Sequence, residues 1–382
     1  MSILLRQTLM FNAVDALYLG FSTAYAFSRY DLVGALLFLA AQYLFSAAGY
    51  YGAFVLMCRS EARPWQVFRA GVAGLAAAML LMAVAPADLW GLSILAVGGA
   101  GRGMAWGGRT WLELAHTKGA GREAYLAMLQ SAVLLIRVVT PLFAAAALYL
   151  SAESYRVMFA LAGALGLLGW VLLSPRATLS TPPPTAANPF RALVSRTYWE
   201  TAPFYVLEGA GAALRQALFV SGTMAVVGSV SAYGVAEACA SLVAAGVLAW
   251  LSTRPTPGPS LSRLKYSLLL VGVAWLLLLG ALNVPVLLGG FVVLYAIGNP
   301  ILVAVKASLV LKGLAMGGQA QDNAVARELM LVTSRLLALG LAAALVYAVR
   351  VPALGLSVVV GLMLALLPLE YWFAKRIAQA AK

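Results

Sequence analysis

Long apolar runs separated by short polar segments recur along the whole chain. Most are about 20 residues long, which lets a helix cross about 30 Å of hydrocarbon. They are continuously apolar, whereas the strands of a membrane barrel alternate apolar and polar residues and close into a sheet. The pattern therefore predicts an all-α polytopic membrane protein with twelve transmembrane helices. The predicted spans are 9–27, 32–57, 66–85, 89–112, 123–149, 155–173, 199–225, 231–251, 266–282, 285–308, 326–348 and 354–373.

The longest polar interruption divides these spans into two groups of six. It covers 174–198 and includes three consecutive prolines, Pro182 to Pro184, which are typical of a flexible or polyproline linker. We therefore predict an N-terminal six-helix bundle over 1–173, a cytoplasmic linker over 174–198 and a C-terminal six-helix bundle over 199–382.

The two predicted bundles share short motifs. Arg102 follows a glycine and precedes the basic residue Arg109 by seven positions, and Asn299 stands in the same relation to Lys306. Further matches in the same order are Asp15 with Glu208 and Glu123 with Glu328. Such internal repetition indicates a duplicated six-helix unit, a symmetry that many transporters have. We therefore expect the two bundles to be pseudo-symmetric.

The positive charge of the chain follows the predicted topology. The sequence is 63% apolar and 10% charged, with a net charge of +13 and a mean hydropathy of +0.91. Among the basic residues of the connecting segments, the span ends and the termini, only Arg29, Arg156 and Arg350 fall on one side, while all the others, Arg327 among them, fall on the opposite side. The positive-inside rule then places both termini in the cytoplasm. Topology thus explains the basic excess, and nucleic-acid binding is not predicted.

Several charged residues lie inside the predicted spans, where each unpaired charge costs about 2.5–3.5 kcal/mol. They must face a water-filled cavity or one another, and helical rise puts Asp15, Glu208 and Arg102 in the middle layer. Asp15 and Glu208 are candidates for proton coupling, because burial favours the neutral form of a carboxylate. Arginines in the spans suit an anionic group, because guanidinium stays charged and pairs with carboxylate or phosphate through two hydrogen bonds. The candidate substrate-binding residues are Arg102, Arg137, Arg215, Arg335, Tyr18, Gln130 and Asn299.

These charges also have a simpler interpretation as ion pairs that hold the bundles together. Glu208 and Arg215 are seven residues apart on one predicted helix and share a face. Arg109 and Lys306 lie near the predicted cytoplasmic surface, where snorkelling of the side chain to water explains them. Glu237 is close enough to the opposite end of its span to reach water.

Other classes of function find no support in the residue inventory. The chain has one histidine and two cysteines, too few for a His-rich metal site or a disulfide framework. It has no nucleotide-binding Gly-Lys-Ser/Thr motif, and one histidine offers little for Ser-His-Asp or Cys-His catalysis. We therefore expect neither an enzyme nor a bound metal or cofactor.

The twelve spans, the six-plus-six division and the cytoplasmic termini resemble the major facilitator superfamily over essentially the whole chain. That family carries a Gly-x-x-x-Asp-Arg-x-Gly-Arg-Arg signature after its second span; here Arg59 and Arg63 match it, and the glycines and aspartate are absent. Its drug antiporters carry a glycine-rich motif in the fifth span, whereas this chain has Thr140-Pro141 without the glycines. The resemblance implies alternating access, with two six-helix bundles rocking about a central site.

Three hypotheses for the function follow. The first is a secondary active transporter, coupled to protons or another ion, that moves a small organic anion or zwitterion across the lipid bilayer of the cytoplasmic membrane as a monomer. The second is an exporter of amphiphilic compounds or lipids on the same fold, which would tolerate neutralisation of Arg102. The third is a non-transporting membrane accessory protein, in which every buried charge is paired. The substrate's identity, the direction of transport and the coupling ion do not follow from the sequence.

Overall fold

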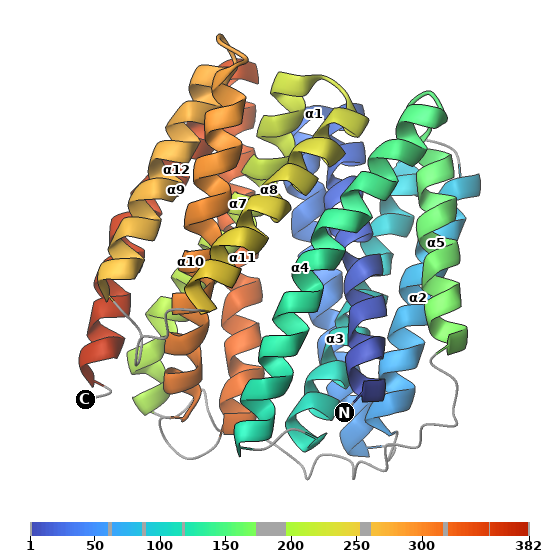
Figure 1. Ribbon diagram of the computed structural model, residues 1–382, viewed down its shortest axis with the longest axis vertical. Coiled ribbons are helices and arrows are strands. Elements are labelled where there is room, and N and C mark those ends of the chain that lie inside the picture. Colours follow the sequence, from blue (N-terminus) through green and yellow to red (C-terminus); the bar gives the residue numbers. More distant parts are fainter. Residues whose placement is uncertain are drawn as a thin grey trace. The chain divides into compact units, whose positions relative to one another are not determined.

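The computed structural model describes residues 2–59, 63–85, 89–116, 119–172, 196–252, 261–315, 320–350 and 352–380. Within these ranges every regular element is an α-helix, eleven in all (Figure 1). The helices are α1 (Ser2–Arg59), α2 (Pro64–Val84), α3 (Leu89–His116), α4 (Gly119–Leu150), α5 (Tyr155–Leu172), α7 (Arg196–Val227), α8 (Val230–Ser252), α9 (Leu261–Ala281), α10 (Leu287–Ala315), α11 (Ala320–Val349) and α12 (Pro352–Ala380).

Every span predicted from hydropathy coincides with a helix or with part of one. Ten helices of the described chain are long and apolar enough to cross a membrane, which makes this a multi-pass membrane protein. α3 is long enough but is not among the ten, because its glycines and the charges of Arg102 and Arg109 lower its hydropathy. α1 covers both of the first two predicted spans. The count of twelve transmembrane helices remains a prediction.

α1 is divided by a sharp break at Tyr30 and Asp31. Both residues have non-helical backbone angles, with φ at −135° for Tyr30 and +62° for Asp31. The carboxylate of Asp31 accepts hydrogen bonds from the backbone N–H groups of Val33 at 2.7 Å and Gly34 at 3.3 Å. Asp31 thus caps the second part of α1, where aspartate is a preferred capping residue. The short loop that the sequence predicts between 9–27 and 32–57 is this break.

The chain forms two compact units. Unit 1 contains Met1–Arg29, Phe38–Ala186 and Ser229–Ala238, and unit 2 contains Tyr30–Leu37, Ala187–Gly228 and Cys239–Lys382. The first turns of α8 thus pack within unit 1 and the remainder of that helix within unit 2. Of the predicted linker, residues 174–195 lie outside the described ranges, and the bundle boundaries stay a prediction.

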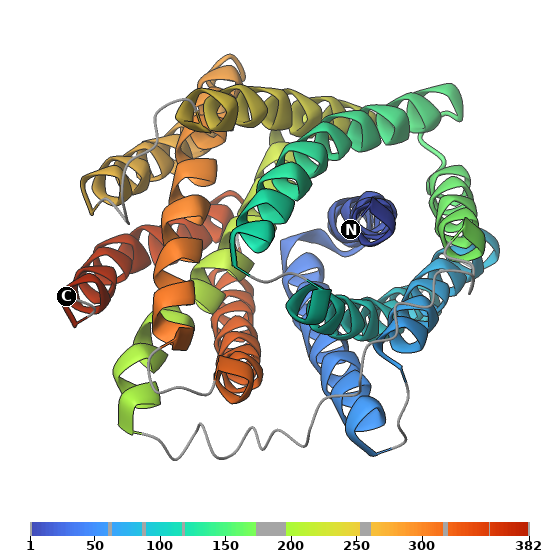
Figure 2. The ribbon, with the colours of Figure 1, turned by 60° about the horizontal axis from the view of Figure 1, so that its bottom comes forward.

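In unit 1, the first part of α1 lies among α3, α4 and α5 (Figure 2). α3 packs closely on α2 because glycines leave room for the neighbouring backbone. A Cβ atom at Gly101 would lie 2.6 Å from the Leu75 nitrogen, and one at Gly108 would lie 2.6 Å from the Phe68 nitrogen. Small residues at helix contacts give close approach inside membranes, where apolar burial alone does not drive helices together. This packing fixes the position of Arg102, which follows Gly101.

In unit 2, the core includes a cluster of aromatic rings between α7, α9 and α10. Trp275 is fully buried, and its ring centroid lies 5.3 Å from that of Phe291 and 5.1 Å from that of Tyr295. Phe219 of α7 stacks on Tyr295 at 5.1 Å. These contacts pack α9 against α7 and α10, the two helices that carry Glu208, Arg215 and Lys306.

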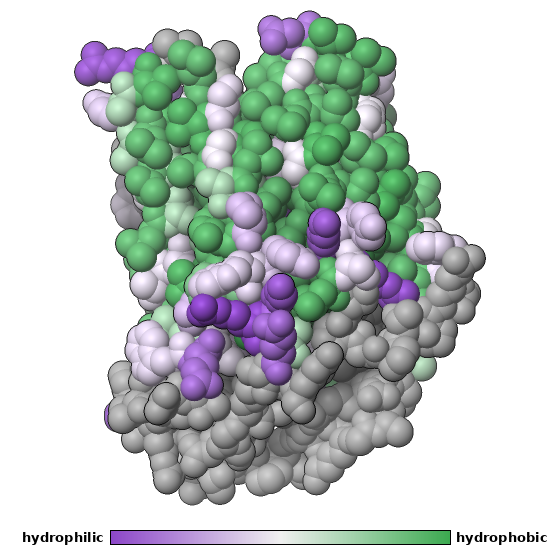
Figure 3. All heavy atoms as spheres, turned by 90° about the vertical axis from the view of Figure 1, so that its left-hand side faces the viewer, coloured by the Kyte–Doolittle hydropathy of each residue, from purple (hydrophilic) through white to green (hydrophobic). Residues whose placement is uncertain are grey.

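The outward surfaces of the helices are apolar as well. On α9, Leu269, Val273 and Leu276 are exposed, while Val271 and Trp275 on the opposite side are fully buried. A helix that is apolar all round suits a lipid environment. The face shown in Figure 3 is broadly apolar between hydrophilic side chains at its upper edge and a second group of them next to the grey atoms.

Candidate functional site

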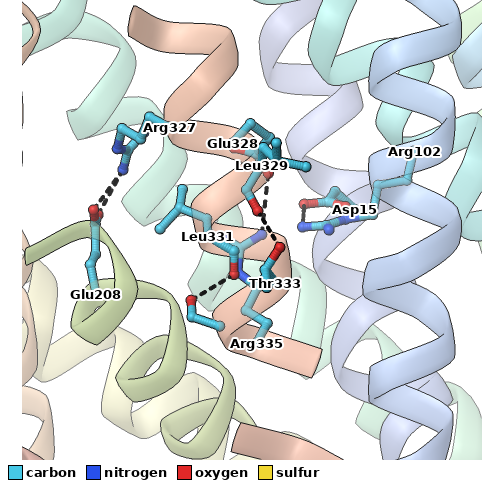
Figure 4. Close-up of polar contacts among 10 residues, drawn as sticks. Asp15, Arg102, Glu208, Arg327, Glu328, Leu329, Leu331, Thr333 and Arg335 are labelled. Carbon is cyan, nitrogen blue, oxygen red and sulfur yellow. Dashed lines mark hydrogen bonds and ion pairs between the residues drawn. The ribbon is translucent and has the colours of Figure 1, made fainter. Parts of the chain in front are cut away.

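In unit 1, Asp15 of α1 and Arg102 of α3 form a two-pronged ion pair (Figure 4). The Nε atom of Arg102 donates to Oδ1 of Asp15, and its Nη2 atom donates to Oδ2 at 3.3 Å. The side chains are 12% and 13% exposed. Paired hydrogen bonds between guanidinium and carboxylate are among the strongest polar contacts in proteins. The structure thus joins two residues that the sequence places in the middle layer.

Tyr18 follows Asp15 by one helical turn and is fully buried. Its hydroxyl donates a hydrogen bond to the backbone carbonyl of Leu95 on α3. Nearby, Ser22 donates to the carbonyl of Tyr18, and Gln42 donates to Ser22 at 3.2 Å. Tyr18 therefore ties α1 to α3 beside the Asp15–Arg102 pair.

In unit 2, Glu208 of α7 pairs with Arg327 of α11 (Figure 4). The Nη2 atom of Arg327 lies 2.7 Å from Oε1 and 2.9 Å from Oε2 of Glu208, and its guanidinium lies 5.7 Å from the centre of the Tyr205 ring. The sequence assigns Arg327 to the cytoplasmic side, among the basic residues that orient the chain. Its partial burial and its partner show that it also belongs to the charged interior of unit 2.

A second buried charge cluster in unit 2 joins α7, α10 and α12. One carboxylate oxygen of Glu370 lies 2.6 Å from Nζ of Lys306, and the other lies 3.4 Å from Nη1 of Arg215. Glu370 is 1% exposed and Lys306 is 3% exposed. The prediction that Lys306 snorkels to water is therefore wrong, because its ammonium group is directed to an internal carboxylate. Arg215 shares a helix with Glu208, yet the two residues bind different partners.

Arg335 and Arg137 have other surroundings. Arg335 lies on α11 and contacts Glu328 of the same helix at 3.3 Å. Arg137 lies on α4, is exposed, and interacts electrostatically with Glu237. A Cβ atom at Gly20 would lie 3.2 Å from Oε2 of Glu237, an oxygen that is buried beside Tyr233. The expectation that Glu237 simply reaches water is therefore wrong for this oxygen.

Asn299 and Gln130 complete the candidates from the sequence. Asn299 precedes Pro300 within α10, and its Oδ1 atom is buried without a hydrogen-bond partner among the described residues. Gln130 lies on α4, but its side chain is outside the part that the structure describes. Asn299 is thus an unused polar group on the helix that carries Lys306.

Arg109 of α3 is also buried, contrary to the expectation that it snorkels. Its Nε atom donates to Glu113 at 2.9 Å, and its guanidinium stacks 4.5 Å from the Trp106 ring. Arg109 and Lys306 occupy matching positions in the two halves of the sequence, and both are internal. They differ in their partners, because Arg109 pairs within α3 whereas Lys306 pairs with α12.

The described residues contain no group of three or more His, Cys, Asp or Glu side chains that could hold a metal ion. The residues that sequence reasoning missed are Glu370 and, as the partner of Glu208, Arg327. Glu370 could have been found by the criterion that selected Asp15, because it is an acid inside a predicted span, 354–373.

Comparisons with known proteins identify the fold. No family model matches the sequence, and no curated protein is similar to it in sequence. Many solved structures are similar in fold. A crystal structure of a POT family transporter in complex with 5-aminolevulinic acid has a TM-score of 0.74 at 13% identity and covers 98% of this chain and 96% of its own.

Two further structures match over the same extent. The human organic anion transporter MFSD10 (TETRAN) has a TM-score of 0.66 at 18% identity, covering 98% of each chain. A bacterial homolog of the human lysosomal transporter Spinster, inward-facing and occupied, has a TM-score of 0.63 at 14% identity, covering 98% of this chain and 97% of its own. The chain thus has the fold of major facilitator superfamily transporters, as the resemblance in sequence predicted. The three matched structures are transporters rather than enzymes.

Proposed function

We propose that this chain, which has the fold of major facilitator superfamily transporters, is a proton-coupled secondary active transporter of a small organic anion or zwitterion. It works by alternating access, in which the substrate site is open to one side of the membrane at a time. The protein acts as a monomer in the cytoplasmic membrane, with both termini in the cytoplasm. The observation that carries the proposal is the set of acid–base pairs inside its helices.

The free-energy cost of placing charges inside membrane spans supports a function for these pairs. A charge inside a membrane span is expensive, so charged side chains there are uncommon and often mark substrate or ion pathways. Asp15–Arg102 and Glu208–Arg327 join helices far apart in sequence, and each retains some exposure. Apolar side chains could hold the same helices together without this cost. The retained exposure supports access of water, protons or a ligand to both pairs.

The similar structures support the substrate class. One of them is an organic anion transporter, and another holds 5-aminolevulinic acid. The arginines in the spans fit an anionic group, because guanidinium remains charged and grips an oxyanion with two donors. We assign substrate binding to Arg102, Arg137, Arg215, Arg335, Tyr18, Gln130 and Asn299.

The acids supply the coupling in this proposal. Asp15 and Glu208 each hold an arginine, and uptake of a proton by the carboxylate removes the negative charge that holds it. The released arginine is then available to an anionic substrate. Release of the proton on the opposite side of the membrane restores the ion pair and expels the anion.

Transport and binding by the full-length protein test the proposal. A thermal-shift screen of organic anions, zwitterions and amphiphiles comes first, because a ligand at a hundred times its Kd stabilises a protein by about 2.7 kcal/mol. Hits are then measured for uptake into proteoliposomes with and without a pH gradient. We expect Arg102→Ala and Glu208→Gln to abolish uptake while the purified variants keep their helical content and elute as monodisperse species.

The alternative functions predict different results. Hits limited to amphiphiles, with uptake indifferent to Arg102→Ala, identify an exporter of amphiphilic compounds or lipids. Unchanged uptake of an organic anion in both Arg102→Ala and Glu208→Gln overturns the proposed mechanism. Uptake that does not respond to a pH gradient removes proton coupling from the proposal.

A further inference from the structure

The cluster of Arg215, Lys306 and Glu370 differs from the other pairs in its charge balance. Asp15–Arg102 and Glu208–Arg327 each combine one acid with one base. Glu370 instead faces two cations, with Lys306 Nζ at 2.6 Å and Arg215 Nη1 at 3.4 Å. All three residues are buried and lie within candidate membrane spans. The cluster therefore carries one uncompensated positive charge in a position where charge is costly.

The charged groups in the described surroundings already have partners of their own. Glu208 of α7 interacts electrostatically with Lys306, but its carboxylate is bound by Arg327 of α11. On α11, Glu328 is taken by Arg335. The buried residues of α9, which also packs on α12, are uncharged over Leu264–Ala281. Asn299 of α10 adds a buried, unpartnered Oδ1 atom but no charge.

Gly211 of α7 makes the close approach of these groups possible. A Cβ atom there would lie 3.0 Å from Nη1 of Arg215 and would meet an oxygen of Glu370. The absence of a side chain leaves the Glu370 carboxylate between α7 and α10, where each of its oxygens meets one cation. An anion of similar size could replace the carboxylate in the same place.

We propose that Arg215 and Lys306 form an oxyanion-binding site whose resident counter-ion is Glu370, and that protonation of Glu370 opens this site to an external carboxylate, sulfonate or phosphate group. The inference deepens the proposed function, on which it rests for its physiological ligand. It identifies Glu370 as an internal competitor of the substrate, so that anion and proton bind together.

The exchange is balanced in charge. Before binding, the cluster holds two cations and one carboxylate. One proton from water converts Glu370 to its neutral acid, and one monovalent anion takes its place beside Lys306 and Arg215. The net charge of the buried site is the same before and after, so the exchange introduces no additional charge into the membrane interior. A single anion without a proton would make the cluster neutral, but it would have to lie against the ionised Glu370 carboxylate, which already contacts both cations.

The test measures binding of methanesulfonate to the purified full-length protein. This probe is a monovalent oxyanion whose charge does not change between about pH 5 and about pH 8, so any pH dependence belongs to the protein. We expect tighter binding at the lower pH, by at most about tenfold per pH unit for one linked proton. Calorimetry in two buffers of different ionisation enthalpy should show uptake of close to one proton per anion at the higher pH.

Three substitutions locate the effect. Glu370→Gln keeps the size of the side chain without its charge, and should bind methanesulfonate at both pH values with no proton uptake. Lys306→Gln and Arg215→Gln should each weaken binding about tenfold or more, because a charge-assisted contact is lost. Glu113→Gln removes the carboxylate partner of Arg109 in unit 1 and serves as the matched control, with wild-type binding and proton uptake.

Each outcome bears on the inference. Binding without proton uptake by the wild type, or binding unaffected by Lys306→Gln, overturns it even where Glu370→Gln fails to fold. Transport that depends on Arg102 and Glu208, without any proton-linked methanesulfonate binding, overturns this inference and leaves the proposed function in place. Proton-linked binding of methanesulfonate that is lost in Lys306→Gln, without transport of any anion, supports this inference and overturns the proposed function.

Discussion

Arg327 of α11 holds both carboxylate oxygens of Glu208 on α7, at 2.7 Å and 2.9 Å from a single guanidinium nitrogen. The two residues are 119 positions apart. The contact fastens the start of α11 to the middle of α7, and it gives Glu208 a partner other than the arginine on its own helix. The pair can therefore be tested separately from the cluster around Glu370.

Removal of one member of this pair should destabilise the protein more than removal of both. Glu208→Gln leaves Arg327 without its carboxylate and should cost about 1.5–3 kcal/mol, the range for hydrogen bonds to charged groups. The double variant Glu208→Gln/Arg327→Gln removes the unpaired charge and should recover part of that loss. Thermal unfolding of the two single variants and the double variant completes the cycle. Strictly additive losses would show that the two side chains do not interact.

The substitution Lys306→Met distinguishes whether the ammonium group of Lys306 is buried inside the protein or reaches water at the membrane surface. With Lys306 bound to Glu370, the substitution removes the shorter of the two contacts to this buried carboxylate, keeps the one to Arg215, and should cost about 1.5–3 kcal/mol, the range for a hydrogen bond to a charged group. Lys375→Met on α12 is the matched control, because Lys375 is exposed and its loss should change stability by less than about 0.5 kcal/mol. The measurement is the unfolding free energy in detergent. Equal, small effects of both substitutions on the unfolding free energy would show that Lys306 lies at the membrane surface.

Gly101→Ala should disturb the packing of α3 on α2. The new Cβ atom would lie 2.6 Å from the Leu75 nitrogen and 2.9 Å from the Gly71 oxygen, and both are backbone atoms that cannot rotate away. We expect a loss of about 1–3 kcal/mol from overpacking. Gly52→Ala on α1 is the control, since nothing lies within 4 Å of its Cβ position and alanine favours a helix by about 0.5–1 kcal/mol. A gain in thermal stability for both variants would contradict the close contact.

Glu153→Ala should loosen the first turn of α8. Glu153 follows α4 and has a φ of +63°. Its Oε2 atom accepts hydrogen bonds at 3.2 Å from the backbone N–H groups of both Val230 and Ser231, and the Ser231 hydroxyl donates to Oε1. Loss of a helix cap costs about 1 kcal/mol, so hydrogen exchange at these two amides should accelerate several-fold.

Glu153→Gln provides the matched control for this cap. It keeps one acceptor oxygen and loses the charge that favours a helix N-terminus, so its amide exchange should fall between those of the wild type and the alanine variant. Exchange rates at Val230 and Ser231 that match the wild type in both variants would exclude a capping role for Glu153.

Local properties of the sequence determined the position and character of the helices. Apolar runs of membrane length predicted a helix at every place where one is found in the described chain. In α12, for example, length and hydropathy are enough to mark Leu354–Gln379 as a candidate span. Asp31, a capping residue between two apolar runs, marks the break in α1. Acids and arginines within those runs marked Asp15, Arg102 and Glu208 as internal charges. These features depend on neighbours a few positions away, so one sequence suffices to find them.

The partners of the internal charges were decided only by the tertiary structure. Asp15, Glu208 and Arg102 were all expected in the middle layer, yet Arg102 meets Asp15, Glu208 meets Arg327, and Lys306 meets Glu370 on α12. Depth along a helix can be read from the chain, whereas the direction of a side chain depends on the rotation and tilt of its helix. Close packing sets that rotation and tilt, as where Gly211 admits the Glu370 carboxylate beside α7. A span shows which charges are buried, and the packing of distant helices decides which opposite charge each one meets.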